Sequence, residues 1–411
     1  MRAVLHLLLR RLIVLGRLTV HWPDGERTSY SGRPGPEAAI RITDNRTIRH
    51  LLLHPELAVG ECYMDGTLVP VDCGLYEVVD LLLANRSAAD SHQELLALHD
   101  ALGWLGRRLV QFNPSGRARR NVAHHYDLNG RLYSLFLDRD RQYSCAYFPT
   151  GSETLDEAQE AKKRHIAAKL RLTRPDLEVL DIGSGWGGMA FTLARDYGAR
   201  VLGITLSQEQ LAESRARAAA QGLSGRVRFE LLDYRGVSES FDRVVSVGMF
   251  EHVGIDHYGA YFDTVRRCLR PDGIALLHAI GRNGRAGFTN PWIAKYIFPG
   301  GYCPALSEVL PAIEKAGLLT TDIEVLRLHY AETLRHWRSR FAANRDAIAA
   351  LFDERFCRMF EFYLCGSETA FRRDNQMVFQ IQLTRDQRAV PLTRDYLAPG
   401  ERAPRMQAAA N

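Results

Sequence analysis

The feature that most constrains this chain is an apolar stretch that breaks into closely spaced glycines, Val-Leu-Asp-Ile-Gly-Ser-Gly-Trp-Gly-Gly at residues 179–188. An apolar run with β-branched residues, followed by glycines, predicts a strand that turns abruptly into a helix. Glycine reaches backbone angles that are costly for other residues, and its missing side chain lets a ligand approach the main chain. We expect a nucleotide against this turn; the simpler alternative is a turn of an α/β core that binds nothing.

Strands and helices alternate from residue 177 onward. The predicted strands are 178–182, 199–204, 227–231, 241–247 and 273–279. Three helices are predicted between them: one that ends at residue 197, one that spans 208–221 and one that ends at residue 269. Alternation at this spacing predicts a parallel, doubly wound α/β sheet, in which ligands gather at the carboxyl ends of the strands.

The residues at these strand ends discriminate between nucleotides. The second strand ends in Gly203-Ile204-Thr205, without the acid that would hold the ribose of NAD, and no phosphate-binding Gly-x-x-x-x-Gly-Lys-Ser/Thr motif is present. Asp181 and Asp233 instead suit S-adenosylmethionine, whose amino acid part is cationic and whose adenine offers an amine donor. Gln210 could contact the ribose, or it could complete a capping box with Ser207.

Polar side chains also follow the fourth and fifth predicted strands. Glu251 and His252 follow the fourth strand, and His278 lies at the end of the fifth. An acid and two histidines beside a methyl-donor site suit proton removal. Taken one at a time, each is more often a satisfied polar group or a helix cap.

Composition limits the remaining possibilities. A chain of 411 residues favours two domains, and seven cysteines without a Cys-x-x-Cys pair argue against a disulfide framework or a structural zinc site. The adjacent His124 and His125 cannot converge on one ion from a helix, so we expect no metal. The net charge of +5 is mild, and its arginine clusters suit phosphate or a solvated face. Residues 1–20 predict a basic amphipathic helix, attached to a membrane interface or frayed.

The pattern changes suggest domain boundaries. We predict an amino-terminal α+β domain at 1–112, a linker at 113–122, a catalytic domain at 123–390 and a flexible tail at 391–411.

Five motifs in this order resemble the cyclopropane-fatty-acyl-phospholipid synthase family, which includes the mycolic acid cyclopropane synthases. They are Tyr-Ser-Cys-Ala-Tyr-Phe at 143–148, the glycine motif at 180–188, Thr-Leu-Ser-Gln-Glu-Gln at 205–210, Val-Gly-Met-Phe-Glu-His-Val-Gly at 247–254 and Tyr-Ile-Phe-Pro-Gly at 296–300. The resemblance implies a Rossmann-like class I methyltransferase that uses S-adenosylmethionine. Residues 18–85 look like the amino-terminal domain of the phospholipid-acting members, which favours an intact phospholipid as substrate.

The resemblance also implies a site. A bicarbonate ion would act as base, held by Cys145, Glu251, His278, the backbone of Ile280 and Tyr330. The implied cofactor-binding residues are Tyr143, Ser144, Asp181, Gly183, Gly185, Thr205, Gln210 and Asp233. Methyl transfer to a cis double bond leaves a carbocation, and loss of a proton from the new methyl closes a cyclopropane ring. An apolar surround would keep water from the cation, and Tyr147, Phe148 and Tyr302 could stabilise it by cation-π attraction.

The expected protein is therefore a cytoplasmic enzyme associated peripherally with the inner face of the membrane, acting on unsaturated phospholipid acyl chains. The family suggests a homodimer, and we expect no nucleic-acid partner. Two alternatives stay open: a fatty-acyl methyltransferase that gives methyl-branched or methylene products, and a non-catalytic lipid-binding protein on the same fold.

Overall fold

The computed structural model describes residues 1–88 and 130–397, which fall into two compact units. The first unit contains residues 1–88, 288–299 and 331–376 of the described chain, and the second contains 130–287, 300–330 and 377–397. Each unit is assembled from segments that are far apart in the sequence. The predicted linker at 113–122 lies outside the described residues, as do His124 and His125, so the predicted domain boundaries stay a prediction.

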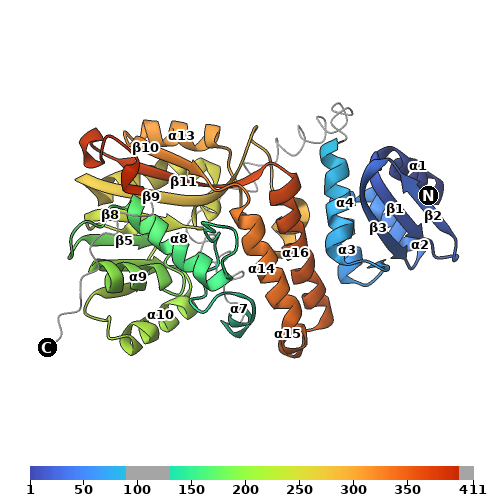
Figure 1. The fold of residues 1–411 in the computed structure, drawn as a ribbon, viewed down its shortest axis with the longest axis horizontal. Helices are drawn as coiled ribbons and strands as arrows, with labels where there is room; N and C mark the ends of the chain where they lie inside the picture. The colour runs from blue at the N-terminus through green and yellow to red at the C-terminus, as the bar shows by residue number, and fades with distance from the viewer. Residues whose placement is uncertain (89–129, 398–411) are drawn as a thin grey trace. The chain divides into compact units, whose positions relative to one another are not determined.

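A seven-stranded sheet forms the centre of the second unit (Figure 1), with strand order β10-β11-β9-β8-β5-β6-β7. Parallel pairing joins β5 to β6 and β8, β6 to β7, and β8 to β9, whereas β10 and β11 pair antiparallel. The predicted α/β fold class is thereby confirmed. The strands are β5 (Glu178–Ile182), β6 (Arg200–Thr205), β7 (Val227–Leu231), β8 (Phe241–Val247), β9 (Leu269–Arg282), β10 (Leu319–Val325) and β11 (Gln376–Thr384).

Helices cover both faces of this sheet, which is why its strands read as nearly continuous apolar runs. Leu180 and Ile182 of β5 pack into a core shared with α11 and α13, whereas Val179 points the other way, into a core shared with α8 and α9. The helices of this unit are α7 (Gly130–Phe136), α8 (Leu155–Lys169), α9 (Gly188–Tyr197), α10 (Gln208–Ala220), α11 (Tyr258–Cys268) and α13 (Leu306–Lys315), with short 3-10 turns η2 (Tyr234–Gly236), η3 (Phe250–His252), η4 (Ile255–His257), η5 (Gln387–Ala389) and η6 (Asp395–Leu397).

Two strands, β10 and β11, were not expected from the sequence. β10 has mostly exposed and half-buried residues, with Asp322 buried, and is rich in threonine and acid, so its apolar signal is weak. β11 is buried almost throughout, yet it contains the polar Gln380 and Gln382. Some 50 residues of chain, mostly helical, separate the two strands, so no hairpin signal joins them.

The first unit has a four-stranded sheet in the order β2-β1-β3-β4, in which β1 pairs antiparallel with β2 and parallel with β3. The predicted smaller α+β unit is present. Its elements are α1 (Arg2–Leu12), β1 (Leu15–His21), β2 (Arg27–Ser31), β3 (Arg33–Ile42), α2 (Asn45–Leu53), α3 (Pro55–Met64), β4 (Leu68–Pro70), α4 (Leu75–Ala88) and α12 (Pro291–Tyr296), followed by α14 (His329–Ala343), whose first two residues belong to the second unit, α15 (Arg345–Leu351) and α16 (Glu354–Arg373).

Helices α14 and α16 lie side by side in this unit (Figure 1), where Arg338 Nε donates to Glu368 Oε2 at 2.9 Å. Tyr63 of α3 donates its hydroxyl proton to Glu361 of α16 at 2.7 Å. A helical segment from late in the sequence thus completes the unit that the amino-terminal residues begin.

Both ends of the described chain differ in detail from expectation. The predicted amphipathic helix at 1–20 ends at Leu12, and β1 takes up the rest of that stretch. Residues 391–397, expected to begin a flexible tail, contact the sheet: Arg394 Nε lies 2.8 Å from Asp322 Oδ1, and the Tyr396 hydroxyl donates to Gln382 at 3.0 Å. The remainder of the predicted tail lies outside the described residues.

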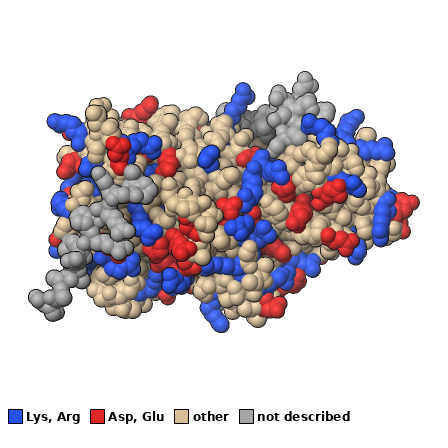
Figure 2. All heavy atoms as spheres, in the orientation of Figure 1, with Lys and Arg blue, Asp and Glu red and all other residues tan. Residues whose placement is uncertain are grey.

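Basic and acidic side chains are interspersed over the face of the molecule shown in Figure 2. On that face, the net charge of +5 is not gathered into one basic patch among the described residues. No helix within residues 1–88 and 130–397 is long and apolar enough to cross a membrane.

Candidate active site

A pocket with an empty volume of about 1120 Å³ lies at the carboxyl ends of the parallel strands in the second unit. Its lining comes from the segment before α8, from the turn after β5, and from residues that follow β6, β7 and β8. All eight predicted cofactor-binding residues line it: Tyr143, Ser144, Asp181, Gly183, Gly185, Thr205, Gln210 and Asp233. The structure therefore brings together residues that span 90 positions in the sequence.

The glycine turn has the geometry that its sequence predicts. Gly183, Gly185 and Gly187 have φ values of +82°, +54° and +86°, which other residues adopt at a cost. A Cβ on Gly183 would lie 2.8 Å from Met249 Cβ, whereas a Cβ on Gly185 would meet nothing within 4 Å. Gly185 therefore leaves open space on the pocket wall, and Gly183 allows the turn to pack against the segment after β8.

Asp181 supplies a polar atom that the protein leaves unpaired. The residue is 2% exposed, and its Oδ2 has no hydrogen-bond partner among the described residues. Burial raises the pKa of its carboxyl to about 7, against the lowering effect of the nearby Lys162. An unpaired buried carboxylate on a pocket wall is a suitable acceptor for an amine or a hydroxyl of a ligand.

The start of α10 combines a helix cap with part of the pocket wall. Ser207 Oγ accepts from the backbone of Gln210 at 3.2 Å, as expected for an N-cap. The Gln210 side chain instead accepts from Thr205 Oγ1 at 2.8 Å. Ser207 is thus the cap, while Gln210 and Thr205 form a hydrogen-bonded pair that lines the pocket.

Asp233 is engaged by a neighbour in the same pocket. Arg235 Nε and Nη2 donate to its two carboxylate oxygens at 2.8 and 2.7 Å. This bidentate ion pair reduces the capacity of Asp233 to accept from a ligand while it fixes the orientation of the carboxylate.

Glu251 lies beyond the pocket, in η3, and is held from β9. Its Oε1 accepts from the backbone of Ile280 at 2.6 Å, and its own carbonyl accepts from the backbone of Tyr302 at 2.9 Å. Its Oε2 is buried without a partner among the described residues, and burial raises the pKa of the carboxyl to about 7. The Ile280 amide was predicted to bind an ion directly. In this structure it donates its hydrogen bond to Glu251 instead.

His278 is 2% exposed and lies two residues before Ile280 on β9. Gln380 Nε2 lies 3.0 Å from its Nδ1, and because an amide nitrogen only donates, Nδ1 is the acceptor. Burial lowers the pKa of the ring well below its usual value, so the ring is neutral and carries its proton on Nε2. That N–H is a donor suited to an anion or to a carbonyl oxygen.

His252, the other histidine predicted at this rim, separates from Glu251. His252 lines the pocket, and burial lowers its pKa to about 4. Two adjacent residues of η3 thus lie in different places: His252 lines the pocket, and Glu251 lies in the buried site behind it.

The remaining predicted ion ligands are buried. Cys145 is 1% exposed and its thiol donates to the carbonyl of Ala146 at 3.2 Å. Tyr330 is 7% exposed and lies in the first turn of α14. Cys145 directly follows Ser144, which lines the pocket, so the pocket and the buried residues share one segment of chain.

The Tyr147 ring, predicted to stabilise a cation, contacts two histidine rings, and its cation-π role stays a prediction. The ring stacks on His165 at 4.2 Å and on His329 at 4.8 Å between centroids, with interplanar angles of 8° and 13°. These stacked histidines cover part of the π surface of Tyr147. Tyr302 is 1% exposed and donates its hydroxyl proton to Glu308 at 2.7 Å.

The residues that support the pocket from behind were not predicted from the sequence. Tyr133 of α7 packs on Trp186 and Tyr143, with centroids 4.8 and 5.4 Å apart. Gln159 and Lys162 of α8 bond to the segment that contains Ser144. A signal was present, because Leu155, Gln159, Lys162, Ile166 and Lys169 recur at helical spacing along the buried face of α8.

Metal chemistry finds no support in the described residues. No group of three or more histidine, cysteine, aspartate or glutamate side chains there could hold a metal ion. The features that bear on the chemistry are the pocket and the buried Glu251 and His278.

Comparison with known proteins places this geometry in context. Residues 114–381 match the family model for mycolic acid cyclopropane synthetase. The chain is 38% identical over 349 residues to cyclopropane-fatty-acyl-phospholipid synthase of Escherichia coli K12, covering 85% of this chain and 88% of that one. It is 37% identical over 404 residues to tuberculostearic acid methyltransferase UfaA1 of Mycobacterium tuberculosis, covering 93% and 91%.

A solved structure agrees with the fold. Mycolic acid cyclopropane synthase CmaA1, complexed with SAH and CTAB, superimposes with a TM-score of 0.62 at 33% identity and covers 66% of this chain and 99% of its own. About a third of this chain therefore has no counterpart in that structure.

Proposed function

The chain belongs to the cyclopropane-fatty-acyl-phospholipid synthase family, which includes the mycolic acid cyclopropane synthases, and from this premise we propose that it converts unsaturated phospholipid acyl chains to cyclopropane chains. The observation that carries the proposal is the buried Glu251 carboxyl, held by Ile280 through one oxygen and unpaired at the other, beside the pocket. The similarity to the phospholipid synthase covers 85% of this chain, against 66% for the mycolic acid enzyme CmaA1, and this favours an intact phospholipid as substrate.

S-adenosylmethionine fits the pocket on two observations. The open space beside Gly185 accommodates a ligand against the main chain, and the unpaired Asp181 Oδ2 can accept from an amine. Tyr143, Ser144, Gly183, Thr205, Gln210 and Asp233 would complete the binding site. When bound, this cofactor supplies an electrophilic methyl group.

The reaction then follows from the buried residues. The methyl carbon would leave the cofactor's sulfur, which keeps the electron pair of the broken bond, and would bond to one alkene carbon, leaving a cation at the other. Loss of a proton from that methyl to the base would let its C–H electrons close the ring. Cys145, Glu251, His278 and Tyr330 would hold a bicarbonate ion that supplies the base. The neutral His278 offers its Nε2 proton, and Ile280 acts through Glu251, whose orientation it fixes. Burial of all these side chains keeps water from the cation.

Product analysis tests this proposal. Vesicles with cis-monounsaturated phospholipids are incubated with the protein and S-adenosylmethionine, and the lipids are analysed by mass spectrometry before and after catalytic hydrogenation mild enough to spare rings. A gain of one methylene on chains that take up no hydrogen supports cyclopropanation. A gain on chains that still take up hydrogen, or on chains that are saturated and branched, contradicts it.

A second candidate is favoured by the relative tuberculostearic acid methyltransferase, which covers 93% of this chain. That candidate transfers the methyl group but resolves the cation into a methylene or methyl-branched chain. A non-catalytic lipid-binding protein is the third, and would give cofactor binding without any lipid product.

We also propose that α1 attaches the protein to an anionic membrane. Met1, Val4, Leu7 and Leu8 are 65%, 53%, 51% and 48% exposed, while Leu5 and Leu9 pack into the core of the first unit. Arg10 and Arg11 lie in the last turn of the same helix. Exposed apolar residues followed by arginines are typical of a helix that lies in a lipid interface.

Vesicle sedimentation checks the role of α1. The double variant Leu7→Asp with Leu8→Asp should bind anionic vesicles about tenfold more weakly, because two apolar contacts are replaced by repelled charges. Leu392→Asp is the matched control, since Leu392 is exposed in the other unit. Equal binding by all three proteins would reject this role. A homodimer and a cytoplasmic location at the inner face of the membrane stay predictions.

A further inference from the structure

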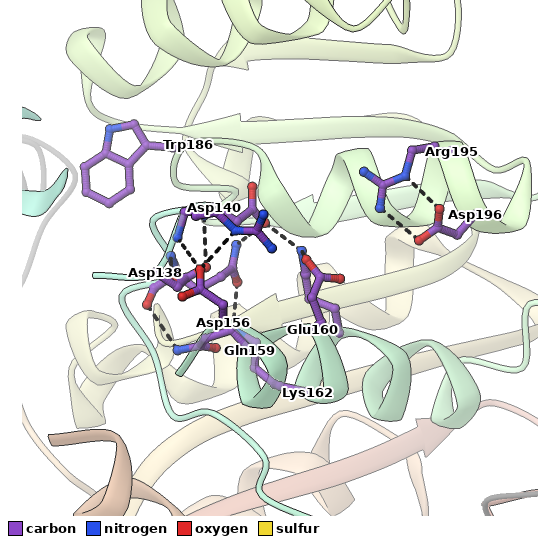
Figure 3. A network of polar contacts seen from close by, with 12 residues as sticks. Asp138, Asp140, Asp156, Gln159, Glu160, Lys162, Trp186, Arg195 and Asp196 are labelled. Carbon is purple, nitrogen blue, oxygen red and sulfur yellow. Dashed lines mark hydrogen bonds and ion pairs between the residues drawn. The ribbon is translucent and has the colours of Figure 1, made fainter. Parts of the chain in front are cut away.

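Polar contacts join helix α8 to the chain segment that contains Asp138 and Asp140 (Figure 3), and the residues that directly follow, 141–144, line the cofactor pocket. Gln159 Nε2 donates to the carbonyls of Gln142 and Ser144 at 3.3 and 2.9 Å, and Lys163 Nζ lies 2.8 Å from Asp140 Oδ2. Between them, Lys162 Nζ donates to Gln142 Oε1 at 2.7 Å and to Ser144 Oγ at 2.8 Å. Gln142 and Ser144 both line the pocket.

Lys162 differs from the two other buried lysines of this helix. Lys163 contacts Asp140 and Glu160, and Lys169 contacts Glu324. Lys162 is 0% exposed, yet both of its acceptors are neutral oxygens. A buried ammonium without a carboxylate in direct contact is costly for folding, so its presence behind the pocket requires a reason other than stability.

The hydrogen bond to Ser144 has a directional consequence. An ammonium only donates, so Ser144 Oγ must accept from Lys162, and the single hydroxyl proton of Ser144 must point elsewhere. Because Ser144 lines the pocket, that proton is available to a ligand there. The same argument fixes the Gln142 amide, whose Oε1 accepts from Lys162 and whose Nε2 donates to Asp140 at 3.2 Å.

We propose that Lys162 is a positioning residue for the cofactor: it turns the Ser144 hydroxyl into a donor toward the pocket and places a positive charge behind it, so that the site recognises the carboxylate of the cofactor's amino acid group. This inference rests on the proposed use of S-adenosylmethionine. A hydroxyl polarised by an ammonium is a stronger donor to an anion than an isolated hydroxyl.

The charge of Lys162 is set by its surroundings. Burial lowers the pKa of its ammonium to about 8. The charged or titratable groups that interact electrostatically with Lys162 are Asp138, Asp140, Cys145, Lys163, Asp181 and His278. Because the ammonium is present below pH 8 and lost above it, cofactor affinity should fall as the pH rises through this range.

Calorimetric titration with S-adenosylhomocysteine, which carries the same carboxylate, tests the inference without turnover. Lys162→Met should weaken binding about tenfold or more at pH 7, since the charge-assisted donation from Ser144 to the carboxylate is lost. Ser144→Ala should weaken it similarly. The double variant should bind no more weakly than Lys162→Met alone, because the lysine acts through the serine.

A pH series separates positioning from a structural role. The wild type should lose affinity between pH 7 and 9 more steeply than Lys162→Met or Ser144→Ala; the amino group of the probe titrates equally in all of them. Lys169→Met, which removes a buried lysine of the same helix that bonds Glu324 instead, is the control and should keep the wild-type pH profile. If Lys162→Met does not fold, Ser144→Ala still provides the comparison.

Three results would overturn the inference: affinity of Lys162→Met within twofold of the wild type, additive losses in the double variant, or a pH profile of Ser144→Ala identical to that of the wild type. Absence of binding by the wild type itself would instead contradict the proposed cofactor.

Discussion

The cofactor pocket and the buried site around Glu251 lie next to each other but are built differently. Main-chain geometry shapes the pocket, through three glycines with positive φ and side chains such as Thr205 and Gln210 that are paired with each other. The site around Glu251 consists of buried titratable groups whose behaviour depends on desolvation. On the proposed function, the pocket is a binding surface that is largely preformed, whereas the site around Glu251 is a set of protonation states maintained by burial.

This difference predicts separable effects, and the largest concerns His278. His278→Ala should lower turnover by about 10²- to 10⁴-fold, because it removes the neutral ring that donates from Nε2. Affinity for S-adenosylhomocysteine should stay within about twofold, since His278 does not line the pocket. Turnover assays and calorimetry on the same preparation check both values, and a parallel loss of affinity would show that the two sites are one.

The pH dependence of stability sharpens the contrast. The pKa of Glu251 is raised from 4.5 to about 7, so between these pH values the folded state keeps a proton that the unfolded state has lost. The stability that this proton provides is complete below pH 4.5 and disappears as the pH rises toward 7. Glu251→Gln has no such proton to lose. Its free energy of unfolding relative to that of the wild type should therefore rise by up to about 3 kcal/mol between pH 5 and 8.

Urea unfolding at several pH values measures that gain. A constant stability difference between Glu251→Gln and the wild type across the range would mean that the carboxyl is solvated rather than buried.

Substitution in the glycine turn should strain the backbone and weaken cofactor binding. Gly183→Ala places a Cβ 2.8 Å from Met249 at a φ of +82°, so we expect about 1–2 kcal/mol of strain, additional loss from the contact, and at least about tenfold weaker cofactor binding. Gly222→Ala is the matched control, because its φ is +66° and its Cβ would meet nothing within 4 Å. Calorimetry should show wild-type affinity for the control and reduced affinity for Gly183→Ala; equal affinities would contradict the preformed pocket.

The smallest effect is expected at Ser207. Its hydroxyl caps α10 by accepting from Gln210 N at 3.2 Å, so Ser207→Ala should cost about 1 kcal/mol of stability and leave cofactor affinity within twofold. Thermal unfolding and calorimetry distinguish this cap from a ligand contact. If Ser207 contacted the cofactor, Ser207→Ala would weaken cofactor binding and leave the stability nearly unchanged.

The two sites also differ in how far the sequence predicts them. The strands 178–182, 227–231 and 241–247 were predicted with the bounds that the structure has, because parallel strands between helices are continuous apolar runs ended by glycine or polar residues. Since the carboxyl ends of parallel strands meet at one edge, the eight pocket residues were placed together with the help of the family motifs.

Burial and pairing could not be predicted in the same way. Residue type suggested Tyr147 as a cation-stabilising ring, but only the fold shows that this ring stacks on His165 and His329. No role was predicted for Lys162, although its spacing in the sequence placed it on the buried face of α8. Contacts between distant segments decide such roles, and a local pattern does not contain them.

The central claim is that binding and chemistry are carried by distinct neighbouring sites, and one variant tests it most directly. Calorimetric titration of Glu251→Gln with S-adenosylhomocysteine should be combined with mass-spectrometric counting of modified acyl chains per enzyme. The account predicts wild-type affinity within about twofold and turnover reduced by at least about 10²-fold. Unchanged lipid products, or affinity lost together with turnover, would contradict it.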